Sequence, residues 1–435
     1  MFFASDGSEP GTTRVDELKT SRSSKSTTLT AYQFRLLAVL ALVNFVNFAA
    51  RQVFIPLIPL LRHHLGVSDA ELGSLQTWLL VILAAGSIPF GFLADRFSRK
   101  TIIVIGVFCW SLATFAGGLM SSYVFLLFAR AAVGLGEAAY APAAQSMISG
   151  SFPQERRARA QAIFATGMLL GGAAGQALGG IVGPRYGWQY ALFIVAAIGV
   201  IPGLAVLSLK EPARGPRSEA VSPLRLLGVP AFVAMLAGGT CITFSSVSLL
   251  FWGVDFAVTY KDFSLRQASV SLSLIVLVSS VCGVLFGGYV ADFLQKRFSY
   301  GRLIATAAAF LLAAPFLILA IQTEEQWIVL AGLAMAGFFM AWYHGPVTAV
   351  IHDMMPRRAH GTSVGLYMFV TQLLGGLGPH LLGRVSDFHD LQYSLEIAVA
   401  VMVGGALLML LVIHFIRRDG LCHPCLDQFR AEPGD

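Results

Sequence analysis

Three charged side chains fall inside long apolar runs of the chain, where a charge is costly to keep. They are Arg51, Arg130 and Glu137. At the centre of a bilayer each would cost about 2.5–3.5 kcal/mol, so they must face one another or a polar cavity. Arginine stays protonated and presents a planar fork that fits phosphate or carboxylate, whereas glutamate can gain and lose a proton. These residue types predict an anion-binding site with one titratable acid.

The spacing of the three charges suggests how they meet. Arg130 and Glu137 are seven residues apart, which on a helix gives nearly the same face and a separation of about 10 Å along the axis. That is too far for a direct ion pair, so we expect Arg51, on another segment, to bridge to Glu137 and leave a net charge of +1. In this interpretation Glu137 is also the proton-coupling residue. The alternative is a static ion-pair cluster that only fixes helix packing.

Other polar residues at membrane depth are weaker candidates, because a lone polar side chain there more often bonds a neighbouring helix than a ligand. We include Asn47, Tyr343 and His344 in the candidate substrate-binding set. Cys422 and Cys425 form a single C-x-x-C in a polar tail and lack the four-ligand spacing of a zinc site. We therefore expect neither a metal nor another cofactor.

The elements that position these side chains are expected to be membrane-spanning helices. Hydrophobic residues make up 56% of the 435 residues and charged residues only 12%, about half the usual share of roughly 25%. Too few charges remain to cover a soluble surface. Runs of about 20 apolar residues can cross a bilayer as helices, and these runs lack the alternation of barrel strands. Twelve such runs predict an all-α membrane protein with spans at 34–61, 70–93, 101–119, 123–149, 160–183, 188–209, 228–257, 267–291, 302–321, 327–350, 361–382 and 393–416.

The basic residues predict the orientation of these spans. With the N-terminus in the cytosol, the inner segments hold 23 of the 30 Lys and Arg residues and the outer loops hold five, which is the bias of cytosolic loops. An even number of spans then places both termini in the cytosol. The polar stretch after span six divides the chain into equal halves. We expect a disordered cytosolic N-terminus (1–33), a first six-helix bundle (34–209), a cytosolic linker (210–227), a second six-helix bundle (228–416) and a cytosolic tail (417–435).

A loop motif occurs twice, 197 residues apart, after spans two and eight. Gly91 to Lys100 and Gly288 to Arg297 both follow G-x-x-x-D-x-x-x-[RK]-[RK]. This duplicated loop resembles the signature loop of the major facilitator superfamily, and the resemblance implies two pseudo-symmetric bundles. A carboxylate in this loop can accept from the N-terminus of a neighbouring helix while the basic residues face the inner leaflet. Such contacts can hold the cytosolic side closed, which makes gating candidates of Asp95, Arg96, Arg99, Asp292 and Lys296.

The segment from Arg130 to Tyr140 in span four reads R-x-x-x-G-x-G-E-A-x-Y. It is similar to the corresponding segment of the Spinster family, whose members are transporters linked to sphingolipids and lysophospholipids. Spinster proteins also carry N-x-x-D-R in span one, whereas here Ala50 stands in place of the acid before Arg51. If that acid carries protons in relatives, this chain lacks the route, and Glu137 is left as the acid near the middle of a span.

Together these features predict a secondary active transporter that works by alternating access and is linked to protons. The resemblance implies an amphipathic anionic lipid as substrate, such as a lysophospholipid or a phosphorylated sphingoid base. The arginines would bind its head group, and the Phe and Leu residues of the cavity wall would bind its chain. The alternative is an exporter of a small organic anion or drug. A receptor or membrane enzyme is more remote, because the loops are short and no catalytic cluster is visible.

Partners and location follow from the same features. The basic residues are scattered between apolar segments, which gives no support to nucleic-acid binding. We expect a multi-pass monomer, surrounded by membrane lipids, in the inner (plasma) membrane of a bacterium.

Overall fold

The computed structural model describes residues 30–212, 222–356 and 359–419, apart from a few side chains within helices, Asp95 and His344 among them. Several helices begin where the sequence supplies a cap. The hydroxyl of Ser68 accepts from the backbone N–H of Glu71, and the Glu71 carboxylate accepts in return from the N–H of Ser68. Thr30 with Gln33 and Ser264 with Gln267 form the same reciprocal box. The described chain is built from helices throughout.

The helices fall into two groups along the chain. The first half contains α2 (Ala31–Gln52), η1 (Ile55–Leu57), α3 (Ile58–Leu65), α4 (Asp69–Arg96), α5 (Arg99–Leu119), α6 (Tyr123–Ser151), α7 (Gln154–Tyr186) and α8 (Trp188–Leu207). The second half contains α9 (Pro223–Leu226), α10 (Pro230–Tyr260), α11 (Leu265–Arg297), α12 (Gly301–Gln322), α13 (Gln326–Met340), η2 (Ala341–Tyr343), α14 (His344–Met354), α15 (His360–Gly375), α16 (Gly378–Phe388) and α17 (Leu391–Asp419).

The predicted spans correspond to these helices, but three of them are interrupted, after Gln52, Met340 and Gly375. Among the described residues, eleven helical segments are long and apolar enough to cross a membrane. The predicted span 361–382 is instead two shorter helices, α15 and α16, interrupted at Gly376 and Leu377. Pro379 is the second residue of α16 and cannot supply a backbone N–H to continue the first helix. The fold is therefore the predicted all-helical membrane fold, with three of its spans interrupted.

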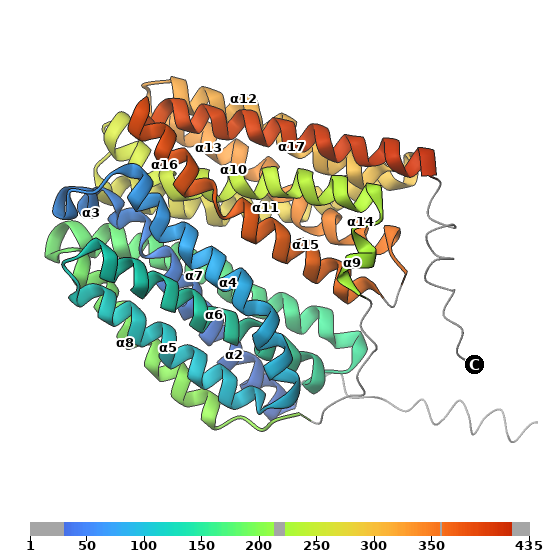
Figure 1. Cartoon of the computed structure of the whole chain (residues 1–435), viewed down its shortest axis with the longest axis horizontal. Helices are drawn as coiled ribbons and strands as arrows, with labels where there is room; N and C mark the ends of the chain where they lie inside the picture. The colour runs from blue at the N-terminus through green and yellow to red at the C-terminus, as the bar shows by residue number, and fades with distance from the viewer. Residues whose placement is uncertain (1–29, 213–221, 357–358, 420–435) are drawn as a thin grey trace, which may run out of the picture.

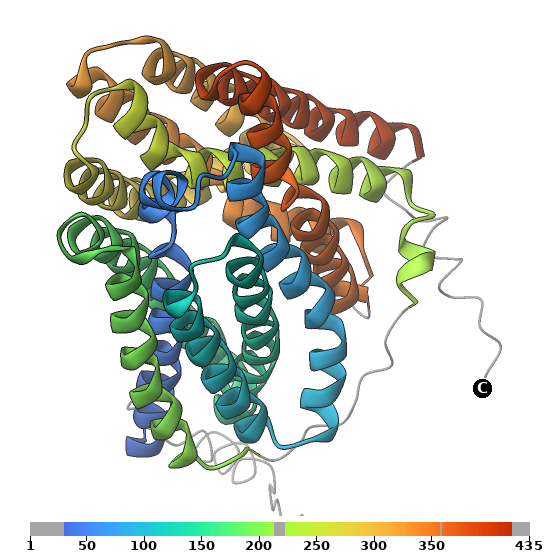
Figure 2. The ribbon, with the colours of Figure 1, turned by 60° about the vertical axis from the view of Figure 1, so that its left-hand side comes forward.

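The two halves form separate bundles that meet at one end of the molecule (Figures 1 and 2). In Figure 1 the bundle coloured blue to green lies below the bundle coloured yellow-green to red. The bundles lie close together where α3 and α16 are found, and they diverge toward the start of α15, as the second view also shows. We call the diverging end, where Arg96, Arg99 and Lys296 lie, the basic end, and the other the opposite end. The orientation of these ends in a membrane stays a prediction.

The small residues of α7 allow a close approach to α2. The sequence places glycine at four-residue intervals there, which favours close helix contact. A β-carbon at Gly171 would collide with the backbone of Phe45, and one at Gly175 would collide with the backbone of Ala49. This packing fixes the position of α2, and with it the position of Arg51.

The ends of the bundles differ slightly from the predicted limits. Helix α2 begins at Ala31 rather than after residue 33, so residues 31–33 are helical, contrary to the predicted disorder. The linker carries the short helix α9, and α17 continues to Asp419. Residues 1–29, 213–221 and 420–435, which include the C-x-x-C pair, lie outside the described residues.

Candidate functional site

Arg51 and Glu137 form an ion pair inside the first bundle, as the charge spacing predicts. Arg51 lies in the last turn of α2, and its Nε donates to Oε2 of Glu137 on α6 at 2.9 Å. Its Nη2 donates to the same oxygen in a second, closer contact. The Glu137 side chain is 1% exposed and that of Arg51 is 17% exposed. The guanidinium also lies over the ring of Phe48, 4.7 Å from its centroid. Arg51 is thus the member of the pair that a ligand can reach.

Arg130 is buried within the first bundle. It is 5% exposed, donates to Oε1 of Gln76 on α4 at 2.8 Å, and stacks over Phe54 at 4.3 Å. Its Nε has no hydrogen-bond partner among the described residues, and neither does Oε1 of Glu137. Buried polar atoms are rarely left unpaired in native structures. These two atoms are therefore positions where a water or a polar ligand group would be stabilised.

Asn47 and Tyr343 lie on different sides of the molecule. Asn47 is 3% exposed within the first bundle, and its amide nitrogen has no partner among the described atoms. Tyr343 ends η2 in the second bundle, where its ring packs edge-on to Phe310. His344 begins α14, but its side chain lies outside the described part of the structure. The predicted set is therefore divided between the two bundles.

Broken helices carry several of these candidates. In the first span, α2 ends at Gln52, one residue after Arg51, and η1 begins at Ile55. The span that contains Tyr343 changes from α13 through η2 to α14. Pro56 and Pro346 follow these two breaks. In transporters, interrupted helices expose backbone groups at the level where substrates bind. The breaks therefore favour a site at this depth.

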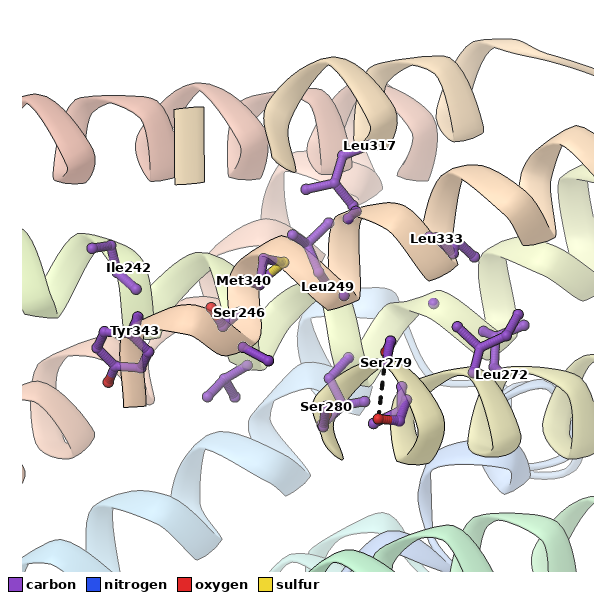
Figure 3. A pocket seen from close by; sticks show the side chains of 18 of the residues that line it. Ile242, Ser246, Leu249, Leu272, Ser279, Ser280, Leu317, Leu333, Met340 and Tyr343 are labelled. Atoms are coloured by element: carbon purple, nitrogen blue, oxygen red, sulfur yellow. Dashed lines mark hydrogen bonds between the residues drawn. The ribbon is translucent and has the colours of Figure 1, made fainter. Parts of the chain in front are cut away.

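A cavity of about 350 Å³ opens in the second bundle (Figure 3). Its wall is mostly apolar and comes from α10, α11, α12 and the α13–η2 segment, with Leu249, Leu272, Leu317 and Met340 as examples. Ser246, Ser279, Tyr343 and Gln372 add a few polar groups. A mostly apolar cavity of this size with few polar groups is typical of a small-molecule site.

Gln176 of α7 lines this cavity from the first bundle. One turn earlier on the same face, a β-carbon at Gly172 would lie 3.5 Å from the side chain of Gln52, the residue after Arg51. Helix α7 therefore adjoins α2 and also contributes to the cavity wall.

The candidate gating residues lie at the basic end and make contacts within their own bundles. The backbone N–H of Arg99 donates to the carboxylate of Glu211, which caps α5. Asp292 contacts Arg302 at 3.5 Å. Arg96 and Lys296 are exposed, and the side chain of Asp95 lies outside the described part. Their role in closing this end stays a prediction, because the structure has the bundles apart there.

Sequence reasoning missed Gln76, the hydrogen-bond partner of Arg130. A glutamine at membrane depth in the second predicted span is a detectable signal, but its partner is on another helix and cannot be identified from spacing. The described residues contain no group of three or more His, Cys, Asp and Glu side chains that could hold a metal ion.

Two helical bundles with interrupted spans, a charged pair in the first bundle and an apolar cavity lined mainly by the second are typical of a multi-pass membrane transporter. The chain matches the family model described as Major Facilitator Superfamily over residues 40–379, and it belongs to that superfamily. The predicted superfamily is thereby confirmed.

Several relatives carry Spinster names. The chain is 26% identical to "Protein spinster" of Drosophila melanogaster over 82% of its length, but spans only 62% of that protein. It is 25% identical to the "Sphingosine-1-phosphate transporter SPNS2" of Xenopus tropicalis, covering 90% of this chain and 84% of that one. An "MFS-type efflux pump" of Mycolicibacterium smegmatis is 26% identical, over 88% and 90% of the two chains.

A solved structure shares the fold. The crystal structure of a bacterial homologue of the human lysosomal transporter Spinster, described as inward-facing and occupied, has a TM-score of 0.80. It is 23% identical and covers 90% of this chain and 99% of its own.

Proposed function

We propose that this transporter moves an amphipathic anionic lipid, such as a lysophospholipid or a sphingosine-phosphate-like molecule, by proton-linked alternating access. The observation that carries the proposal is a mostly apolar cavity in the second bundle together with a partly exposed arginine in the first. An anionic head group would bind Arg51 and its neighbours in the first bundle, and the hydrocarbon chain would fill the cavity of the second. The relative named as a sphingosine-1-phosphate transporter supports this class of substrate.

A second candidate is export of a small organic anion or drug, which the relative named as an efflux pump favours. The two candidates differ in what the apolar cavity contributes. A lipid chain would gain about 0.8 kcal/mol for each methylene that it buries. A compact anion would gain little from a longer chain.

The test measures binding of alkyl phosphates of increasing chain length to the purified protein. We expect affinity to rise with chain length until the cavity is filled, and Arg51→Ala to weaken binding of every member. Ser246→Phe, which fills the cavity wall, should remove the dependence on length and spare the shortest phosphate. Ile198→Phe, on an exposed position of α8, is the control. An affinity that does not change with chain length would favour the small-anion exporter.

Native mass spectrometry of protein purified from its membrane adds an independent result. We expect anionic lysolipid to co-purify with the unmodified chain and to be absent from Arg51→Ala and Arg130→Ala. If both variants bind an anionic lysolipid with unchanged affinity, the head-group site lies elsewhere.

We also propose that the basic end faces the cytosol of a bacterial cell, with both termini on that side, and that the protein acts as a monomer. The bias of the basic residues supports this orientation. In this orientation the two bundles touch at the extracellular end of the molecule and are separated at the cytosolic end.

A further inference from the structure

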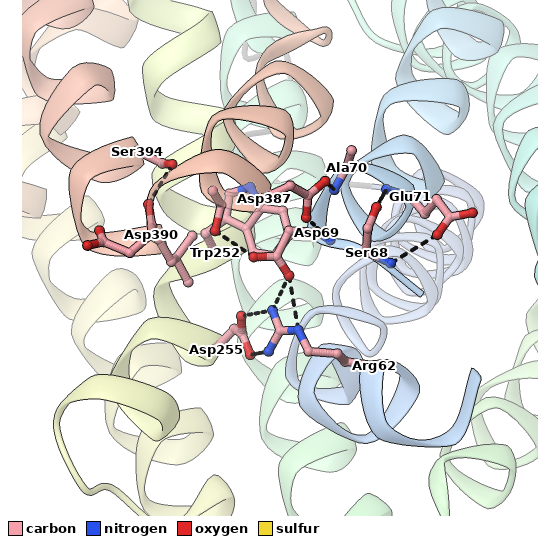
Figure 4. Close-up of polar contacts among 12 residues, drawn as sticks. Arg62, Ser68, Asp69, Ala70, Glu71, Trp252, Asp255, Asp387, Asp390 and Ser394 are labelled. Atoms are coloured by element: carbon pink, nitrogen blue, oxygen red, sulfur yellow. Dashed lines mark hydrogen bonds and ion pairs between the residues drawn. The ribbon is translucent and has the colours of Figure 1, made fainter. Parts of the chain in front are cut away.

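A second ionic cluster joins the two bundles at the opposite end (Figure 4). Arg62 of α3 forms a two-point contact with Asp255 of α10, at 2.9 and 2.6 Å, and its Nε donates to Asp69 of α4 at 3.0 Å. Arg62 and Asp69 belong to the first bundle and Asp255 to the second. The Asp255 side chain is fully buried. Two-point arginine–carboxylate pairs are strong and geometrically specific.

Asp387 of α16 makes a separate contact across the same interface. Its carboxylate accepts from the backbone N–H groups of Asp69, at 2.8 Å, and Ala70, at 3.1 Å. These are the first residues of α4, where N–H groups lack partners within the helix and the helix dipole favours negative charge. Ser386 adds a hydrogen bond to the Asp69 carboxylate at 2.5 Å.

The charges of this cluster are divided between the bundles. The second bundle contributes two carboxylates, Asp255 and Asp387. The first bundle contributes the Arg62 guanidinium and the N-terminus of α4, and Asp69 orients Arg62 from the same side. Each carboxylate therefore meets its positive partner only when the bundles touch. We call Arg62, Asp69, Asp255 and Asp387 the gate cluster.

The surfaces around the gate cluster are in close contact. A β-carbon at Gly73 of α4 would collide with the backbone of Pro379 on α16, and one at Gly180 of α7 would collide with Ser269 of α11. These contacts leave no room for a side chain. The opposite end is therefore closed by packing as well as by charge.

We propose that the gate cluster holds the opposite end closed through two unequal contacts, and that both must break for that end to open. The Asp255–Arg62 contact is the stronger, because its carboxylate is buried and held at two points. The Asp387 contact is the weaker, because Asp387 is exposed and exposed charges are screened by salt. When the opposite end opens, Asp255 separates from Arg62 and Asp387 separates from the start of α4 in the same movement.

The test measures distances between spin labels in the full chain, with native cysteines replaced. One pair, at Tyr186 and Glu325, reports the opposite end, and the pair at Ala162 and Ser299 reports the basic end; all four positions are exposed. We expect Asp255→Asn to shift the equilibrium toward an open opposite end by about tenfold or more. The two distances should change in opposite directions.

Asp387→Asn should give a smaller shift, and high salt should abolish the difference between it and the unmodified chain. The matched control is Asp390→Asn, since Asp390 caps α17 within its own bundle by accepting from Tyr393 N–H at 2.6 Å. Gly180→Trp, which wedges the interface, shows that the labels report opening.

Exchanging the charges in Arg62→Asp with Asp255→Arg, combined with Asp69→Asn so that two carboxylates do not meet, should restore closure. This variant also covers the case in which Asp255→Asn fails to fold. The proposal is overturned if Gly180→Trp lengthens the Tyr186–Glu325 distance while Asp255→Asn and Asp387→Asn leave it unchanged. It is also overturned if the exchanged pair stays open.

Discussion

At the scale of residues, Glu137 is bonded on one side only. One carboxylate oxygen accepts from Arg51, and the other has no partner among the described residues. Arg130 lies on the same helix and is occupied by Gln76 and Phe54. A proton on Glu137 would remove the ionic partner of Arg51 and free its guanidinium for an anionic substrate. Proton binding and substrate binding are then linked through one side chain.

We expect Glu137→Gln to remove the pH dependence of the conformational equilibrium. In the unmodified chain a proton on Glu137 would release Arg51, so its conformational equilibrium should depend on pH. Glutamine resembles the protonated state at every pH. The spin-label distance between Ala162 and Ser299, recorded at several pH values, measures the effect.

Glu71→Gln is the matched control, because glutamine can keep the capping box with Ser68. A pH response that survives in Glu137→Gln would exclude Glu137 as the sensor. The histidines within the predicted spans 327–350 and 361–382, His344 and His380, would then be the groups to replace.

The residues that sequence reasoning found and missed have a physical explanation. Arg51, Arg130 and Glu137 stand out because charge is rare within apolar runs. Asp255 lies near the end of the predicted span 228–257 and was not included among them, although an acid inside an apolar run is the same signal. Arg62 comes directly after the predicted span 34–61, in a loop of the predicted topology. Their pairing depends on contact between bundles, which no local pattern specifies.

At the scale of elements, the breaks and the small residues decide where the site lies. The span limits follow from length and hydropathy, and most agree with the helices to within a few residues. The interruptions after Gln52, Met340 and Gly375 were not predicted, although Pro56, Pro346 and Pro379 stand close to them. Proline inside a membrane helix can be accommodated by neighbouring helices. Its presence alone therefore does not locate a break.

We expect Gly171→Val to destabilise the first bundle by several kcal/mol, because the added side chain meets the backbone of Phe45 and α7 must move away from α2. Thermal unfolding in detergent measures the loss. Gly404→Val is the control, since the space around Gly404 on α17 is open. Equal melting temperatures for the two variants would show that the close contact of α2 and α7 contributes little.

At the scale of the whole molecule, the duplicated loop correctly indicated the superfamily and the two bundles. It did not indicate which end is closed. That depends on small energy differences between two arrangements of the same bundles, and a single structure records one of them. The gating residues of the duplicated loops are therefore expected to meet across the bundles in the other arrangement.

The orientation in the membrane can be tested in intact cells. We expect a single cysteine at Ser299 to be protected from a membrane-impermeant thiol reagent, and one at Tyr186 to react. Ser299 lies at the basic end and Tyr186 at the opposite end, and both are exposed. Permeabilised cells, in which both positions should react, serve as the control. The reverse pattern would invert the proposed topology.

Because Asp387 caps α4, the hydrogen exchange of two backbone amides reports how often the opposite end opens during transport. The N–H groups of Asp69 and Ala70 are hydrogen-bonded across the bundles, so they are shielded from deuterium only while the opposite end is shut. Their exchange rate in heavy water should rise each time that end opens, without any label or substitution. Added substrate should change this rate in the peptide that carries Asp69, and leave it unchanged in the peptide that carries Tyr393, whose cap lies within one bundle.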